Sequence, residues 1–168
     1  MAITLSRIEQ YMDTLGMKYQ KKDETTLLTG ATDEKGQVMI AIQLMEDGEF
    51  LLIRSVKHLD DLVEEANDEK RAALMSWMLY QNYKSKLGAW EYDPSDHDHH
   101  LSVTCPIEDG DLTFKQFTRL LQVITNSCEA IPEMKKLLGL VSEEIDPIEL
   151  KRRELLAQLA ALDGNSGI

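Results

Sequence analysis

Apolar and polar positions near the start of the chain alternate with the period of a helix. Apolar residues recur every three or four positions over residues 4–15, which places them on one side of a helix. This stripe consists of Leu5, Ile8, Met12 and Leu15. Gly16 follows directly and is suited to end a helix. The pattern predicts an amphipathic helix that packs one face against a core.

The next part of the chain has the composition of β-strands. Residues 25–32 are rich in β-branched side chains, and residues 37–45 and 49–56 are largely apolar. Glycine-containing turns at residues 33–36 and 46–48 separate these three segments. Short turns between such segments favour antiparallel hairpins.

The predicted strand over residues 37–45 is apolar on both faces. One face carries Val38, Ile40, Ile42 and Leu44, and the other carries Met39, Ala41 and Met45. A strand of this kind needs cover on both sides. The chain's own helices can cover one side, and a second subunit or a ligand can cover the other. We therefore take Met39, Ala41 and Met45 as candidates for partner binding.

A long helix is predicted over residues 68–87, after a short acidic helical turn at residues 59–66. Asn67 or the residue after it is suited to be the N-cap of this helix. Between Ala72 and Tyr80 the helix is apolar nearly all round. Such a helix is expected to be central in the fold.

Two more strands are predicted at residues 89–92 and 100–105, joined by a polar loop. Trp90 and Tyr92 on the first of them are candidates to line a groove for a peptide. A last helix begins at Thr113, because Thr113 and Gln116 have the spacing of a capping box. Pro132 interrupts that helix, and a short turn at residues 133–138 follows.

A separate helix is predicted in the tail of the chain. Asp146 and Pro147 have the order of an N-cap followed by proline at the first helical position. An apolar stripe of Ile148, Leu155, Leu159 and Leu162 then runs through a basic segment, Lys151-Arg152-Arg153. We divide the chain into a domain over residues 1–140 and a tail over residues 141–168. The stripe is expected to dock on apolar surface, in the same molecule or in its twin.

These elements predict an α+β fold of one domain. Hairpin-linked strands indicate an antiparallel sheet of about five strands with helices packed on it. The expected order is α-β-β-β-α-β-β-α, with the tail helix at the end.

Composition narrows the class of protein. The 168 residues include 43% hydrophobic residues, which is enough to form a core. Lys and Arg total 18 against 30 Asp and Glu, so the formal charge is −12. Nucleic acids and anionic lipids would be repelled, whereas solubility or attraction of a basic partner explains the acidity. No signal peptide, membrane-spanning run or cofactor motif is recognised, and the expected location is the cytoplasm.

The loop over residues 93–100 is the one segment with ligand chemistry. Its candidate metal ligands are Asp96, His97, His99 and His100. His97 and His99 would share a face if the loop were extended. A solvated turn is the simpler interpretation, and it predicts that replacing His97, His99 and His100 with Ala changes stability little. The alternative is a metal-dependent enzyme or a metal-binding protein that uses this loop.

The two cysteines, Cys105 and Cys128, lie on apolar faces of a predicted strand and a predicted helix. We interpret both as small core residues. Nucleophilic catalysis by Cys105 with a loop histidine needs a thiol of lowered pKa, and the acidic surroundings do not favour one.

The order of elements resembles the YbjN-like family, whose fold is that of type III secretion chaperones. The resemblance rests on the N-terminal stripe that runs into Gly16 and Tyr19, on the hairpin of residues 38–42 with 50–54, and on residues 103–113, which enter the last helix. It covers roughly residues 4–138. It implies a homodimer that binds segments of other proteins, and it supplies no catalytic residues.

The sequence therefore predicts a non-enzymatic chaperone-like or adaptor module that holds an amphipathic segment of a partner protein. The candidate partner-binding residues are Met39, Ala41, Met45, Trp90, Tyr92, Ile148, Leu155 and Leu159.

Overall fold

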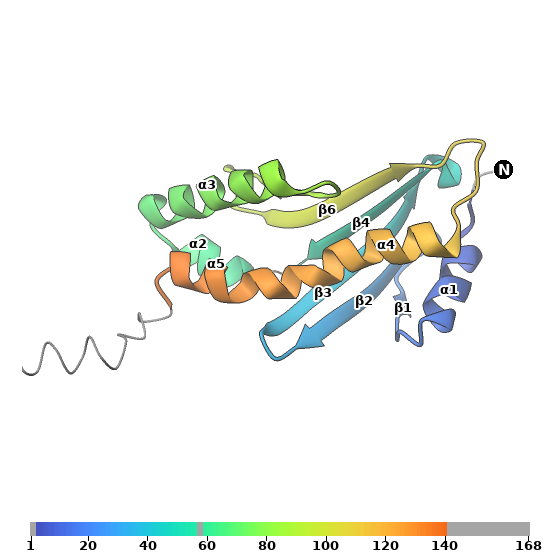
Figure 1. The fold of residues 1–168 in the computed structure, drawn as a ribbon, viewed down its shortest axis with the longest axis horizontal. Coiled ribbons are helices and arrows are strands. Elements are labelled where there is room, and N and C mark those ends of the chain that lie inside the picture. Colours follow the sequence, from blue (N-terminus) through green and yellow to red (C-terminus); the bar gives the residue numbers. More distant parts are fainter. Residues whose placement is uncertain (1–2, 57–58, 141–168) are drawn as a thin grey trace, which may run out of the picture.

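A computed structural model describes residues 3–56 and 59–140 of the chain (Figure 1). Its centre is a six-stranded sheet with the order β1-β2-β3-β4-β6-β5, and every pair of neighbouring strands is antiparallel. The strands are β1 (Gln20–Lys21), β2 (Thr26–Asp33), β3 (Gly36–Met45), β4 (Phe50–Val56), β5 (Ala89–Tyr92) and β6 (His99–Pro106). The predicted α+β class and antiparallel sheet are confirmed.

The helices lie before, between and after these strands. They are α1 (Leu5–Thr14), α2 (Asp60–Glu65), α3 (Asp68–Lys84), α4 (Phe114–Thr125) and α5 (Ile131–Leu137), with short 3-10 helices η1 (Glu46–Gly48) and η2 (Asn126–Ala130). Helix α4 crosses β3, β4 and β6, and η2 and α5 continue it along the same side of the sheet (Figure 1). Helix α3 packs on β5 and on α5.

The register of the central strands divides the sheet into two faces. Ile42 of β3 pairs with Ile53 of β4, which pairs with Val103 of β6, and all three side chains are buried. One residue along, Gln43 pairs with Leu52, and Leu52 pairs with a residue of β6 that is exposed. Because side chains alternate along a strand, the first row faces α4 and the second row faces away from it. We call the side under α4 the core face.

Several local signals explain where the helices begin and end. The Asn67 side chain accepts a hydrogen bond from the Lys70 backbone N–H at 3.0 Å and caps α3. Thr113 and Gln116 form the predicted capping box at the start of α4. Gly16 has a φ of +66° after α1, a left-handed conformation that glycine adopts without strain. These predictions are confirmed.

The structure adds one strand to the predicted sheet of about five, and it overturns the prediction that the long helix is central. The sheet has a sixth strand, β1, whose two exposed residues carry no apolar pattern. Helix α3 is not central, because Leu74 and Met78 are its only buried residues. Leu79 is 69% exposed and Tyr83 is 87% exposed. The apolar character of α3 on its outer side is therefore surface and not core.

The predicted tail helix, with Ile148, Leu155, Leu159 and Leu162, lies outside the described residues. No helix within residues 3–56 or 59–140 is long and apolar enough to cross a membrane.

Candidate functional site

The face of the sheet opposite α4 carries a row of apolar side chains, which we call the open sheet face. Its apolar members are Leu28, Met39, Ala41, Met45, Phe50, Leu52 and Val56. Met39 is 41% exposed, and the others except Ala41 are half-buried. An apolar surface that extends over neighbouring strands is typical of a binding site.

The described helices do not cover the open sheet face. Every buried apolar residue of these helices belongs to a single core cluster. The strand residues in that cluster all lie on the core face, and Ala41, which is buried on the other face, is not among them. Leu52 and Val56 also have no packing contact with this cluster. The open sheet face is therefore apolar surface that the described part of the chain leaves uncovered.

A cation lies in the middle of this apolar surface. Arg54 stands between Leu52 and Val56 on β4, and its cross-strand neighbours are Ala41 and Ser102. Its Nε atom is buried and has no hydrogen-bond partner among the described residues. A buried donor without a partner is unfavourable. An acidic side chain brought by another molecule would supply the missing acceptor.

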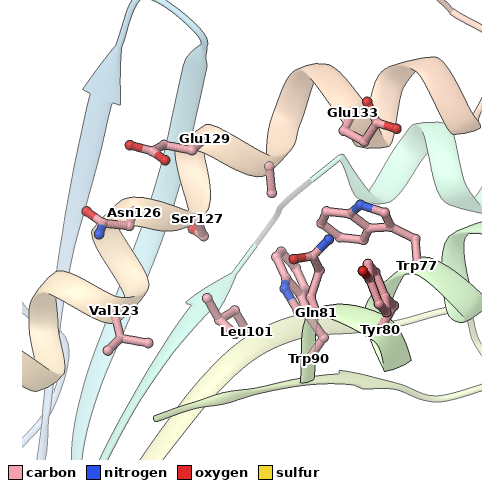
Figure 2. Close-up of a pocket in the computed structure, with 11 residues that line it drawn as sticks. Trp77, Tyr80, Gln81, Trp90, Leu101, Val123, Asn126, Ser127, Glu129 and Glu133 are labelled. Carbon is pink, nitrogen blue, oxygen red and sulfur yellow. The ribbon is translucent and has the colours of Figure 1, made fainter. Parts of the chain in front are cut away.

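A second candidate surface lies on the other side of the sheet, between α3 and the α4–η2–α5 segment (Figure 2). We call it the α3 groove, and its volume is about 610 Å³. Trp77 and Tyr80 of α3, Trp90 of β5 and Glu129 and Glu133 line it. The rings of Trp77 and Trp90 lie 5.7 Å apart, centroid to centroid.

Asn82 fixes the edge of the α3 groove. Its side-chain amide donates to the Trp90 carbonyl oxygen at 2.9 Å, and its carbonyl oxygen accepts from the Trp90 backbone N–H at 2.7 Å. The amide thus pairs with the backbone of β5 as a neighbouring strand would. This contact joins α3 to the edge of the sheet and holds the two tryptophans in place.

The structure separates the predicted partner-binding residues into distinct places. Met39, Ala41 and Met45 lie on the open sheet face, whereas Trp90 lines the α3 groove. Tyr92 is half-buried and hydrogen-bonded to the His loop. The other candidates, Ile148, Leu155 and Leu159, lie outside the described residues.

The sequence analysis missed other members of the open sheet face. They are Leu28, Phe50, Leu52, Arg54 and Val56. Side chains alternate between the two faces along β2 and β4. Pairing these strands with Met39 and Ala41 of β3 would have identified the residues that share their face.

His97 has a structural role in the loop between β5 and β6. The Arg71 guanidinium lies 3.0 Å from His97 Nε2, and the Tyr92 hydroxyl lies 2.9 Å from His97 Nδ1. Because a guanidinium can only donate, Nε2 accepts from Arg71 and Nδ1 donates to Tyr92. Burial is the main cause that raises the pKa of Tyr92 above its ordinary value.

Arg71 extends this network to the corner before α3. Its guanidinium also donates to the backbone carbonyl oxygens of Val63, Glu64 and Ala66. His97 is therefore bound to the α2–α3 corner through Arg71. The solvated turn describes residues 93–96 and 98, which are exposed, but not His97.

The other loop candidates do not converge with His97. His99 is buried on the core face, with Nδ1 3.3 Å from the His97 carbonyl oxygen, while His100 Nε2 lies 2.7 Å from Glu91. An Asp96 carboxylate oxygen accepts from the Asp98 backbone N–H. His97 has a φ of +65°, so the loop is not extended and His97 does not share a face with His99 as expected.

No group of three His, Cys, Asp or Glu residues in the described ranges is placed to hold a metal ion. The expectation that the triple His-to-Ala change leaves stability nearly unchanged loses its basis, because His97 and His99 are both tied into the fold.

The cysteines do not have the surroundings of catalytic nucleophiles. Burial raises the pKa of both thiols, Cys105 and Cys128. The Cys128 thiol lies 3.6 Å from the Ala31 carbonyl oxygen and is fully buried. A thiol of raised pKa is protonated at neutral pH, which favours the interpretation of packing residues.

Comparison with solved structures places this geometry among known folds. YbjN from E. coli, a proposed transcription regulator, is 15% identical over a match that covers 82% of this chain and 90% of that chain, with a TM-score of 0.53. A chain of the HopA1–SchA chaperone–effector complex is 14% identical, with coverage of 76% and 91% and a TM-score of 0.52.

The chain has the type III secretion chaperone-like fold. The resemblance to the YbjN-like family that the sequence indicated is thereby confirmed at the level of the fold. A chain of the ExsC–ExsE complex also matches, with 18% identity, coverage of 77% and 93% and a TM-score of 0.49. No protein-family model and no curated protein matches the chain. Because a fold does not determine a function, the binding surfaces must carry the functional argument.

Proposed function

We propose that this protein is a cytoplasmic, non-enzymatic binding module, and that its open sheet face holds an amphipathic segment of a partner protein. The observation that carries the proposal is the apolar row of Met39, Leu52 and Val56, which no described helix covers. One of the structures with this fold is a chaperone–effector complex, and a role in holding another protein is consistent with that likeness.

Arg54 gives the partner segment a chemical signature. Its Nε has no hydrogen-bond partner in the described part of the chain and lies within apolar surface, so a carboxylate that enters this surface would gain a charge-assisted hydrogen bond. We therefore propose that the bound segment carries an Asp or Glu within its apolar face. The specificity would come from Arg54, and most of the buried area would come from the apolar row.

Site-specific cross-linking tests this assignment. A photo-reactive amino acid replaces Met39 in the full chain, which is cross-linked in its native cytosol, and the cross-linked peptides are sequenced by mass spectrometry. The expected product is a segment of another protein with an apolar stripe that contains an acidic residue. The matched control places the same amino acid at Gln122, an exposed position of α4. Cross-links from position 39 only to residues 141–168 or to a second copy would contradict the proposal.

Two variants then test the chemistry with the identified segment as a peptide. Leu52→Asp is expected to abolish binding, because it places a charge within the apolar row. Arg54→Gln is expected to weaken binding about tenfold, as loss of a hydrogen bond to a charged group typically does. Equal affinity of Arg54→Gln and the unchanged protein would show that no acidic residue meets Arg54.

The homodimer stays a prediction. The prediction came from the strand that is apolar on both faces, and the helices within residues 3–56 and 59–140 leave one of those faces uncovered. Sedimentation equilibrium at tens of micromolar, roughly the range of ordinary dimer affinities, checks it. Only monomer in that range would show that the association is absent.

A further inference from the structure

Two hollows beside α3 form an apolar trench. Tyr80 of α3 lines the α3 groove, and Leu87, in the turn after α3, lines a further hollow of about 440 Å³ that shares Trp90 and Val123 with the groove. Tyr80 and Leu87 are both exposed. The trench therefore runs from Trp77 of α3 to Leu87, past the end of that helix.

Charge changes sign along this trench. Glu133 of α5 lies beside Trp77, and Glu129 of η2 lies farther along the trench, near Asn126 and Ser127 (Figure 2). Lys84 and Lys86 line the hollow at the opposite end. An occupant with basic residues at one end and an acidic residue at the other would match both ends.

The described chain ends beside the acidic end of the trench. Leu140 N–H donates to the Lys135 carbonyl oxygen at the close of α5. Gly139 lies against α3, since a Cβ placed on it would come within 2.8 Å of Lys70 Nζ. The chain therefore leaves α5 near the first turn of α3, seven residues after Glu133.

The residues that follow have the matching order of side chains. Lys151, Arg152 and Arg153 come first, Leu155, Leu159 and Leu162 come next, and Asp163 comes last. From residue 151 to residue 162 a helix would rise about 16 Å, whereas α3 rises about 10 Å from Trp77 to its last residue, Lys84, so such a helix would reach past the end of α3 toward Leu87. Residues 141–145 can span up to about 18 Å, enough for the chain to turn back along α5.

We propose that residues 146–162 form a helix that lies in the α3 groove of the same molecule, antiparallel to α4 and α5. Lys151 and Arg152, which flank the leucine stripe, meet Glu129 and Glu133. Leu155 and Leu159 cover Trp77, Tyr80 and Trp90, and Asp163 comes near Lys84 and Lys86. A short connection between antiparallel neighbours is the usual arrangement of two successive helices.

This inference does not depend on the proposed function. The α3 groove and the open sheet face lie on opposite sides of the sheet. Truncation after Leu140 is therefore expected to leave binding at the open sheet face unchanged while it exposes the groove. Failure of one proposal leaves the other intact, since each surface has its own variants.

Carbodiimide cross-linking tests the register on the full chain. An equal mixture of ordinary and nitrogen-15-labelled protein is treated, and cross-linked peptides are analysed by mass spectrometry. Lys151 is expected to couple to Glu129 or Glu133, with both peptides of each pair carrying the same isotope. Pairs of mixed isotope would place the tail on a second molecule and overturn the proposal. Absence of both couplings would overturn it as well.

Fluorescence gives an independent readout, because the chain has two tryptophans and both line the groove. The double change Leu155→Asp and Leu159→Asp is expected to shift the emission to longer wavelength and to increase quenching by acrylamide. The matched control is Leu150→Asp, since Leu150 lies on the opposite side of the predicted helix from Leu155. Equal quenching in the double variant and the control would contradict the docking.

A misfolded variant would not be restored by a second change at the opposite charges. Charge reversal in the tail, followed by charge reversal in the groove, therefore distinguishes loss of docking from misfolding. Reversal of residues 151–153 to Glu is expected to raise the same quenching, and a second change, Glu129→Lys with Glu133→Lys, is expected to lower it again. The matched second change is Glu24→Lys with Glu34→Lys, two exposed residues elsewhere. Rescue by this control pair, or no rescue by the groove pair, would show that the groove charges do not hold the tail.

Discussion

The two faces of the sheet are formed by the same strands, and neighbouring residues show how differently they are used. Ile53 of β4 is fully buried under the helices, whereas Leu52, the residue before it, lies half-buried on the open sheet face. On β3 the pair Ile42 and Met39 repeats the contrast, with Ile42 fully buried and Met39 41% exposed. Hydrophobicity alone does not distinguish these residues, because all four are large and apolar.

The difference comes from what each face can contact within the chain. Helix α4 has a continuous buried stripe, including Phe117, Leu121 and Ile124, and it fills the core face. No second helix of this kind is available to the open sheet face in the described residues. A strand that is apolar on both sides therefore has one face packed in the core and one face that the described helices leave uncovered.

The largest expected difference in unfolding free energy is between the truncation of a core-face residue and the truncation of its neighbour on the open sheet face. Ile53→Ala removes a fully buried side chain between Ile42 and Val103 and is expected to cost about 2–5 kcal/mol of unfolding free energy. Leu52→Ala, its matched control, is expected to cost less than about 1 kcal/mol. Urea denaturation of both variants measures the difference. Equal losses would show that the open sheet face is packed as tightly as the core.

Two histidines of the loop between β5 and β6 give a second comparison. His97 is bonded to Arg71 at the α2–α3 corner, whereas His100 lies on the open sheet face beside Glu91. His97→Ala removes one acceptor of the Arg71 guanidinium and the partner of the Tyr92 hydroxyl, and is expected to cost about 1–3 kcal/mol. His100→Ala breaks a partly exposed pair with Glu91 and is expected to cost about 0–1 kcal/mol. A His100 variant as unstable as the His97 variant, in the same denaturation assay, would contradict the structural role of His97.

Much of the fold could be predicted because its signals are local. The segment 37–45 is predicted as a strand from its apolar composition and its flanking turns, and β3 begins one residue earlier and ends at the same residue, Met45. The capping box at Thr113 and Gln116 requires only four consecutive residues, and it is present. Residues 89–92 were predicted as a strand with the bounds that β5 has.

The remainder depends on partners distant in sequence. Pattern alone could not show that α3 lies at the edge of the fold, because burial is decided by packing on β5 and α5. Nor could it show that Arg71 reaches His97, which is 26 residues further along the chain. The strand β1 has two residues and gains its register from β2, so it has no periodicity to detect.

The core face also depends on where α4 begins. Thr113 accepts from the Gln116 backbone N–H at 3.2 Å, and Gln116 accepts from the Thr113 backbone N–H at 2.9 Å. Thr113→Ala removes one of these bonds and is expected to cost about 1 kcal/mol. The matched control is Thr118→Ala on the same helix, where the hydroxyl bonds only the Phe114 carbonyl oxygen within the described structure. Equal stability of the two variants in urea would show that the cap does not fix α4.

The smallest expected effect concerns the turn that joins β5 to β6 at the edge of both faces. The Ser95 hydroxyl, at 2.6 Å, and the Ser95 backbone N–H, at 2.8 Å, donate to Asp93 and lower the pKa of that carboxyl below its ordinary value. A carboxyl with a lowered folded pKa stabilises the fold above its unfolded pKa of about 3.9 and loses this contribution as pH falls through the folded value. Asp93→Asn keeps an acceptor for Ser95 but removes the titration. Acidification from pH 6 is therefore expected to destabilise the unchanged protein slightly more than the variant in urea denaturation. An equal loss in both would show that Ser95 does not stabilise the charged carboxylate.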